Sequence, residues 1–213
     1  MAIKPILFNT EMVRANLDGR KSCTRRLVKG FVPDDAIWGY TAFTPKGYIS
    51  CRGTFADGYG EKFFKLPYQP GDILYVRETV WQKTGHYLDV DGETKAVWCN
   101  EFKYVATDEK PETGWNYSWV KRPSIHMPKE AARIWLKVTD VRVERLQEIT
   151  EIGATKEGCV YDVEYALGNT AKGHFIEIWN STIKKSDRDR YGWNANPWVW
   201  TIEYERCEKP EGV

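Results

Sequence analysis

Short runs in which apolar and polar residues alternate dominate this chain and predict a strand-rich protein. In the clearest run, at 73–78, Leu74, Val76 and Glu78 fall on one face. Further strands are predicted at 3–8 from a short apolar run, at 23–28, at 133–146 from alternation that changes phase near Thr139-Asp140, and at 197–204 from a run of aromatic residues. Apolar residues at helical spacing are confined to short stretches near 10–18, 150–158 and 175–183. This mixture predicts an α+β fold built on a mixed, largely antiparallel β-barrel with a few short helices.

Capping and turn residues mark the ends of these segments. Thr10 and Thr150 are candidate helix N-caps, and Gly19 is a candidate helix stop. Two stretches do not fit the simple barrel pattern. Residues 30–66 are rich in Gly and aromatics, whereas 84–118 are polar and acidic, with Asp91-Gly92 as a hairpin turn signal. We expect both stretches to be inserted hairpins within a single domain spanning 1–213.

The charge of the chain is balanced overall but unevenly distributed. Lys and Arg total 31 and Asp and Glu total 30, for a net charge of +1, which argues against a globally basic nucleic-acid binder. Residues 14–29 nevertheless carry six basic residues and one acid, and residues 89–112 carry seven acids and three lysines. The N-terminal segment therefore provides a local site for an anionic partner.

Cysteine and histidine usage gives no indication of a cofactor. The five cysteines form no CxxC pair and the three histidines have no paired spacing, so we expect neither a metal site nor a cofactor. No stretch approaches the ~20 apolar residues of a membrane span, and we expect no signal peptide. We expect a cytoplasmic protein with reduced thiols, no membrane partner, and a monomeric or weakly dimeric state.

The most informative segment for chemistry is Gly19-Arg20-Lys21-Ser22-Cys23-Thr24-Arg25-Arg26. Taken alone, Arg20 and Lys21 are explained by a favourable interaction with a helix C-terminus, about 0.3–1 kcal/mol each. Glu78 is harder to explain, because it shares a face with apolar residues and an inward carboxylate needs a cation or hydrogen-bond donors. Lys21 would serve as that cation. The alternative is that Glu78 lies at the strand end, open to water.

Two further features are open to both a structural and a functional interpretation. His126 lies in the proline-bracketed segment Arg122-Pro123-Ser124-Ile125-His126-Met127-Pro128, where it could contact a substrate, although a lone loop histidine is more often structural. The ten tryptophans and twelve tyrosines could stack on bases. Aromatic residues more often fill a core, and we favour that role for most of them.

Two of these segments carry a family resemblance. The run from Gly19 to Arg25 resembles the ASCH-domain pattern Gly-x-Lys-x-x-Thr-x-Arg. The run Pro70-Gly71-Asp72-Ile73-Leu74-Tyr75-Val76-Arg77-Glu78 resembles the second signature of that family, a turn leading into a strand that ends in Glu. ASCH domains have a fold similar to PUA RNA-binding domains. The whole chain also resembles phage or prophage members of the superfamily, which share the loop around His126 and the Asn-Pro-Trp-Val-Trp segment at 196–200.

The resemblance implies an activity and a set of site residues. Small bacterial ASCH enzymes that hydrolyse N4-acetylcytidine use a Lys, a Thr and a Glu, which correspond here to Lys21, Thr24 and Glu78. By this resemblance Thr24 is the nucleophile, Lys21 its base, and Glu78 a group that orients Lys21 or shuttles protons. The residues expected to bind substrate or oxyanion are Arg20, Arg25, Arg26 and His126.

Two other functions remain open from the sequence. The first is a non-catalytic RNA- or nucleotide-binding module, or a metal-independent ribonuclease, in which the basic residues at 20–26 hold phosphate. The second is an accessory phage protein that contacts a host protein through the acidic stretch 84–118.

Overall fold

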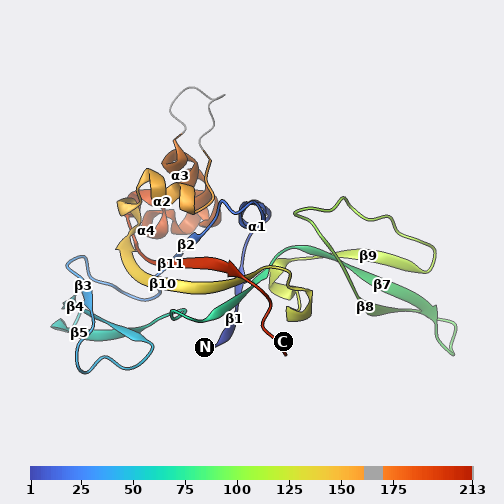
Figure 1. Cartoon of the computed structure of the whole chain (residues 1–213), viewed down its shortest axis with the longest axis horizontal. Coiled ribbons are helices and arrows are strands. Elements are labelled where there is room, and N and C mark those ends of the chain that lie inside the picture. Colours follow the sequence, from blue (N-terminus) through green and yellow to red (C-terminus); the bar gives the residue numbers. More distant parts are fainter. Residues whose placement is uncertain (161–169, 213) are drawn as a thin grey trace. The chain divides into compact units, whose positions relative to one another are not determined.

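The computed structural model describes residues 1–160 and 170–212, which divide into two compact units (Figure 1). The first unit contains residues 1–2, 20–72 and 137–205. The second contains residues 3–19, 73–136 and 206–213. Each unit is built from segments that are distant in sequence, so long-range contacts define both.

The first unit is centred on β2 (Cys23–Leu27), β10 (Trp135–Arg145) and β11 (Trp198–Cys207), with β11 between the other two. β11 runs antiparallel to β2 and places Ile202 opposite Thr24. The helices α2 (Glu151–Lys156), α3 (Ala171–Thr182) and α4 (Arg188–Tyr191) lie together on one side of these strands (Figure 1). Their shared core includes Leu146, Phe175, Trp179 and Val199.

The first predicted insertion forms a separate sheet within the first unit. Its strands are β3 (Ile37–Gly39), β4 (Tyr48–Phe55) and β5 (Gly58–Lys65), all antiparallel. Trp38 in β3 packs edge-on against Trp198 and Trp200, with ring centroids 5.8 and 6.2 Å apart. These aromatic side chains therefore pack against one another, with Trp200 buried and Trp38 and Trp198 half-buried.

The second unit begins with β1 (Ile3–Leu7) and α1 (Thr10–Leu17) and continues with β6 (Ile73–Arg77). β1 and β6 pair in parallel, with Ile6 beside Val76. The N-cap of α1 is Asn9, one residue before the predicted Thr10, and its side chain accepts a hydrogen bond from the Met12 amide at 2.8 Å. Asn and Thr are both good caps, and the sequence does not distinguish them at adjacent positions.

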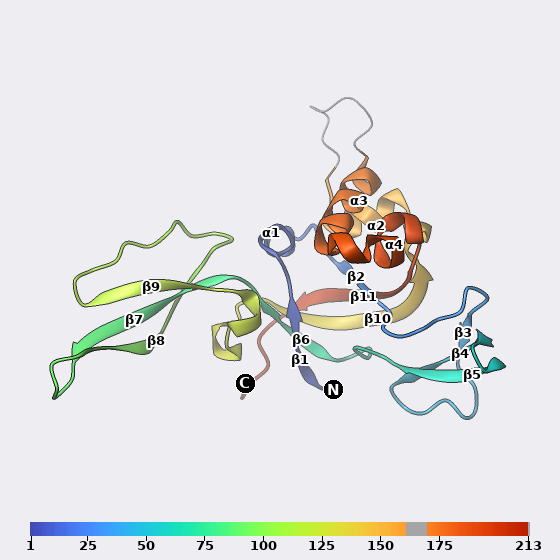
Figure 2. The same ribbon diagram turned by 180° about the vertical axis from the view of Figure 1, so that it is seen from behind.

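A second three-stranded sheet completes this unit (Figure 2). It consists of β7 (Val80–Leu88), β8 (Thr94–Tyr104) and β9 (Tyr117–Arg122), with β7 in the centre. The turn between β7 and β8 contains Gly92 at φ 78°, which confirms the Asp91-Gly92 hairpin signal. Two 3-10 turns, Ser124–His126 and Lys129–Ala131, lead on to β10.

The observed fold confirms the α+β class and its strand-rich character, but the barrel prediction is wrong. Among the described residues, no sheet is closed on itself. Each sheet keeps two edge strands: β1 and β2 in the largest sheet, β3 and β5 in the first three-stranded sheet, and β8 and β9 in the second. Barrel closure requires the first and last strands to pair, a long-range property that local alternation does not encode. None of the helices within 1–160 and 170–212 combines the length and apolar character needed to span a membrane.

Candidate functional site

Lys21 is fully buried in the first unit, just before β2. Its side chain is 0% exposed, and Nζ donates three hydrogen bonds: to the carbonyl oxygen of Cys23 at 2.8 Å, to that of Glu157 at 2.7 Å, and to Glu157 Oε2 at 2.7 Å. An ammonium group has three protons to donate, and these contacts occupy all of them. Before Lys21 can act as a base, it must therefore pass one proton to an acceptor.

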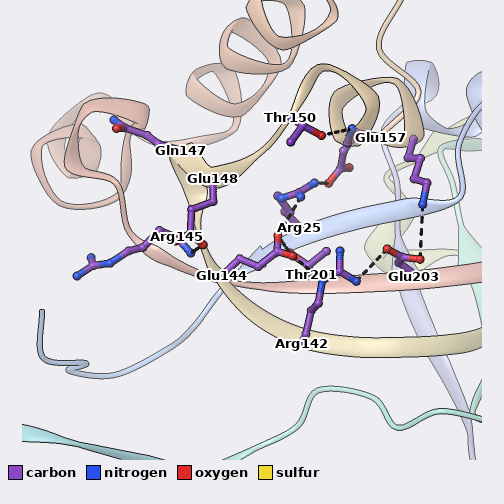
Figure 3. Close-up of polar contacts among 12 residues, drawn as sticks. Arg25, Arg142, Glu144, Arg145, Gln147, Glu148, Thr150, Glu157, Thr201 and Glu203 are labelled. Carbon is purple, nitrogen blue, oxygen red and sulfur yellow. Dashed lines mark hydrogen bonds and ion pairs between the residues drawn. The ribbon is translucent and has the colours of Figure 1, made fainter. Parts of the chain in front are cut away.

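Arg25 is the second buried cation of the motif. Nη1 lies 3.2 Å from Glu157 Oε1 and Nη2 lies 3.0 Å from Glu144 Oε2, so Arg25 is held between two carboxylates (Figure 3). Its guanidinium also lies over the ring of Phe175 in α3, 5.9 Å from the centroid. Glu157, at the end of α2, thus neutralises Lys21 with one oxygen and Arg25 with the other.

The charged network continues along β10 and β11 (Figure 3). Glu144 also accepts hydrogen bonds from Thr201 Oγ1 at 2.9 Å and from Arg142 Nε, and Arg142 contacts Asp140 and Glu203 as well. Burial raises the pKa of Glu144, but these donors and the charge of Arg25 outweigh it and hold the pKa below its ordinary value. Glu144 therefore stays ionised at neutral pH.

Thr24 carries the only hydroxyl among the predicted site residues, and within residues 1–160 and 170–212 that hydroxyl has no hydrogen-bond partner. It lies between Cys23 and Arg25 on β2, so its side chain projects to the opposite face of the strand from Arg25. The side chain is buried, and Oγ1 makes no hydrogen bond. A buried polar group without a partner costs about 1–3 kcal/mol, so this hydroxyl needs an explanation.

Cys23 lies next to these groups and is excluded as a nucleophile at neutral pH. Burial raises the pKa of its thiol to about 12, and the negative charge of Glu157 adds to this effect. The nearby positive charges of Arg25 and Lys21 only partly offset the increase. Cys23 is therefore a protonated, packed side chain.

Arg20 and Arg26 are the more accessible basic residues of the motif. Arg20 is exposed, and its Nη1 donates to the carbonyl oxygen of Gly158 at 2.8 Å. Arg26 follows Arg25 on β2 and is partly exposed. Of the predicted ligand-binding arginines, these two are accessible to an anion in solution, whereas Arg25 is paired inside the unit.

Glu78 belongs to the second unit, where it follows β6 directly. Its carboxylate is buried and accepts two hydrogen bonds from Arg133, from Nε to Oε1 and from Nη2 to Oε2, both at 2.9 Å. Arg133 also lies over the ring of Tyr104, 3.9 Å from its centroid. The sequence pointed to a cation for Glu78 and suggested Lys21. In the structure, the cation that pairs with Glu78 is Arg133, not Lys21.

His126 ends a 3-10 turn in the second unit and is exposed. Arg77 holds this turn by donating to the carbonyl oxygens of Met127, at 2.8 Å, and of Ile125. The structure thus places Lys21, Thr24 and Arg25 in the first unit, with the side chain of Thr24 on the opposite face of β2 from that of Arg25, and it places Glu78 and His126 in the second. Their catalytic and binding roles remain predictions.

Three residues that pair directly with predicted site residues were not predicted from the sequence: Glu144, Glu157 and Arg133. Glu157 is 136 residues from Lys21 in sequence, and Arg133 is 55 residues from Glu78. No local spacing could have indicated either pair. The only available signal was indirect, because buried cations and carboxylates require partners of opposite charge.

Comparison of the chain with protein-family models, with curated proteins and with solved structures found no match.

Proposed function

We propose that this protein is an amidohydrolase that removes the acyl group from N4-acetylcytidine or a similar acylated nucleoside, in an ASCH-type, PUA-like fold. Thr24 is the proposed nucleophile. The observation that carries the proposal is the buried Thr24 hydroxyl without a hydrogen-bond partner. A ligand atom beside Oγ1 would supply the missing hydrogen bond.

The proposed reaction proceeds through an acyl-enzyme. Thr24 Oγ1 attacks the acyl carbonyl carbon, the C–N bond breaks, and the nucleobase leaves with a free exocyclic amino group. A water molecule then attacks the ester carbon, which releases the carboxylic acid and restores the threonine. Each half of the reaction needs one group that removes a proton and one that returns it.

The contacts of Lys21 suggest how it can take part in these transfers. As an ammonium group it cannot accept a proton, but Glu157 Oε2 lies 2.7 Å from Nζ. Transfer of one proton to Glu157 leaves a neutral amine beside a neutral acid. Since Thr24 Oγ1 has no hydrogen-bond partner among the described residues, a water molecule between the two groups would carry the proton of Thr24 to that amine. The proposal therefore adds Glu157 as the proton acceptor for Lys21. Glu78 is not part of these steps. Its predicted role in proton transfer is kept as a separate proposal with its own test.

The same contacts are less favourable for a module that holds phosphate on the residues at 20–26. Lys21 and Arg25 are buried, and their charges are neutralised by Glu157 and Glu144. Arg20 and Arg26 are the arginines of this segment with exposed surface, and two cations support weak binding. Hydrolysis of an acylated base is the better-supported use of this segment.

The test is release of the acyl group from N4-acetylcytidine by the purified full chain, followed by chromatography of cytidine. We expect turnover by the unaltered protein, loss of turnover in Thr24→Val, and partial retention in Thr24→Ser, which keeps a hydroxyl. Thr201→Val removes a hydroxyl from the neighbouring strand and is expected to remain active. Absence of turnover on acylated nucleosides would overturn the activity, and full turnover by Thr24→Val would overturn the nucleophile.

The assignment of Glu78 is tested separately with Glu78→Gln, which keeps the size of the side chain and hydrogen-bond acceptance at one atom. If Glu78 transfers a proton, kcat falls and its pH dependence changes, although the protein remains folded by circular dichroism. An unchanged pH profile would remove Glu78 from the mechanism.

A further inference from the structure

One face of the sheet β8-β7-β9 carries a mixture of aromatic and lysine side chains. Odd-numbered residues of the central strand β7 lie on this face, and their antiparallel partners lie on it too. Trp81 has a lysine on each side, Lys103 on β8 and Lys121 on β9. Further along β7, the same face carries three more cross-strand pairs: Lys83 with Trp119, Gly85 with Tyr117, and Tyr87 with Lys95.

The contacts on this face show that several lysines lie against the aromatic rings. Lys121 Nζ is 5.7 Å from the centroid of Trp81, and Lys83 Nζ is 5.0 Å from that of Tyr117. Tyr87 is 50% exposed. The face therefore offers partly open π-surfaces next to positive charge.

The charges on this face favour the binding of an anion, although the stretch 84–118 is acidic as a whole. Lys83 pairs with Glu101, and Lys95 pairs with Asp89 near the β7–β8 turn. Within the described part of the chain, Lys103 and Lys121 have no acidic partner within ion-pair distance. Both flank Trp81, so two lysines without an ion pair lie next to one of the two tryptophans of this face.

The opposite face of the sheet is different in character. Gln82 and Thr84 are buried there and are used in hydrogen bonds, Gln82 Nε2 to the carbonyl oxygen of Cys99 and Thr84 Oγ1 with Ser118 Oγ. Trp98 is 51% exposed on this side and is covered by Arg122, 4.5 Å from its centroid. The opposite face thus combines internal polar contacts with one half-exposed tryptophan beside an arginine, whereas the first face carries several aromatics between lysines.

From this asymmetry we propose that the face formed by Trp81, Lys83, Tyr87, Lys103, Trp119 and Lys121 binds single-stranded nucleic acid. Every base has a π-face, so aromatic side chains stack on bases with little sequence preference, while lysines neutralise the phosphates between them. In a duplex the bases are stacked on one another and cannot lie on the rings. This site does not depend on the proposed hydrolase activity, and it is separate from the motif at 20–26.

The experiment measures fluorescence anisotropy of fluorescein-labelled 20-nucleotide probes titrated with the full chain at low salt. The probes are oligo(dT), oligo(U) and a DNA duplex. We expect both single strands to bind more tightly than the duplex and the affinity to fall as salt increases. The ratio of the affinities for oligo(U) and oligo(dT) shows whether the site distinguishes RNA from DNA.

Tyr87 and Trp98 provide a matched pair of variants, because both are half-exposed aromatics on adjacent strands but lie on opposite faces. We expect Tyr87→Ala to weaken single-strand binding about 5-fold or more, and Lys103→Gln with Lys121→Gln to reduce its salt dependence. Trp98→Ala is expected to bind within 2-fold of the unaltered protein. Lack of single-strand binding at low salt, equal losses in the two aromatic variants, or capture of an acidic protein without nucleic-acid binding would overturn the proposal.

Discussion

Glu157 contacts Lys21 with both its main chain and its side chain, since Nζ of Lys21 lies 2.7 Å from the carbonyl oxygen and 2.7 Å from Oε2 of the same residue. The two backbones also form an isolated antiparallel β-bridge. The other carboxylate oxygen faces Arg25. One residue at the end of α2 therefore holds two cations that are four positions apart in the N-terminal motif.

Removal of the Glu157 charge is expected to destabilise the protein strongly. Glu157→Gln leaves Lys21 and Arg25 buried with one carboxylate fewer, and loss of one member of a buried charge pair typically costs about 3–5 kcal/mol. Urea denaturation followed by circular dichroism measures this loss. Glu205→Gln is the control, because its pair with Lys137 is exposed and spans 3.5 Å. We expect that control to change the free energy of unfolding by less than about 1 kcal/mol, and similar losses in both variants would contradict the role of Glu157.

Glu78 and Arg133 are expected to be energetically coupled. Arg133→Ala leaves the Glu78 carboxylate buried without its bidentate partner, and we expect a loss of about 3 kcal/mol, the lower end of the range for buried pairs because Arg133 is partly exposed. The double variant Glu78→Ala with Arg133→Ala removes both charges together. Its loss should be smaller than the sum of the two single losses by about 1–3 kcal/mol. Strict additivity in this cycle would show that the pair contributes no coupling.

Replacement of Thr24 by valine is expected to stabilise the protein in the absence of ligand. Valine has nearly the same shape, and the change removes a buried hydroxyl that has no hydrogen bond, so we expect a gain of about 1 kcal/mol. Thr201→Val provides the comparison, because its hydroxyl donates to Glu144 at 2.9 Å. That variant should lose about 2 kcal/mol. Thermal denaturation of both variants measures the difference, and a loss in Thr24→Val as large as that in Thr201→Val would indicate that the Thr24 hydroxyl has a protein partner.

Ionisation of the Cys23 thiol is expected to lower the free energy of unfolding at alkaline pH. Burial raises the pKa of its thiol from 9.0 to about 12 in the folded protein. The protonated thiol is therefore favoured by folding, and this contribution is complete below pH 9 and is lost as the pH rises from 9 to 12. The free energy of unfolding, measured at intervals across that range, should fall less steeply in Cys23→Ala than in the unaltered protein. Parallel curves for the two proteins would contradict the raised pKa.

Local sequence signals predicted most of the regular elements. Alternation identified β6 and a run of aromatic residues identified β11, and Thr150 was correctly identified as the N-cap of α2, where its side chain accepts from the Gly153 amide at 3.0 Å. Gly92 marked the turn of the second inserted hairpin. These features depend on residues within a few positions of one another, so a single sequence is sufficient to find them.

The surroundings of the candidate site residues were much less predictable. The alternation of β6 indicated that Glu78 faces inward, and it is buried, but its cation lies 55 residues away. Lys21 and Thr24 stood out because of the motif, whereas their surroundings depend on α2 and β11, which come from the second half of the chain. No local pattern in the sequence indicates which of these distant segments pair.

The sequence by itself determined the α+β class, the positions of several strands and the basic segment at 19–26, because apolar periodicity, caps and turns act over short distances. Only the tertiary structure decided that the sheets stay open, that Glu157 holds Lys21 and Arg25, and that the Thr24 hydroxyl lacks a partner. Each of these outcomes depends on which distant segments pack together to remove apolar surface from water. Which segments pack together depends on interactions throughout the chain, so these contacts could be identified only in the folded structure.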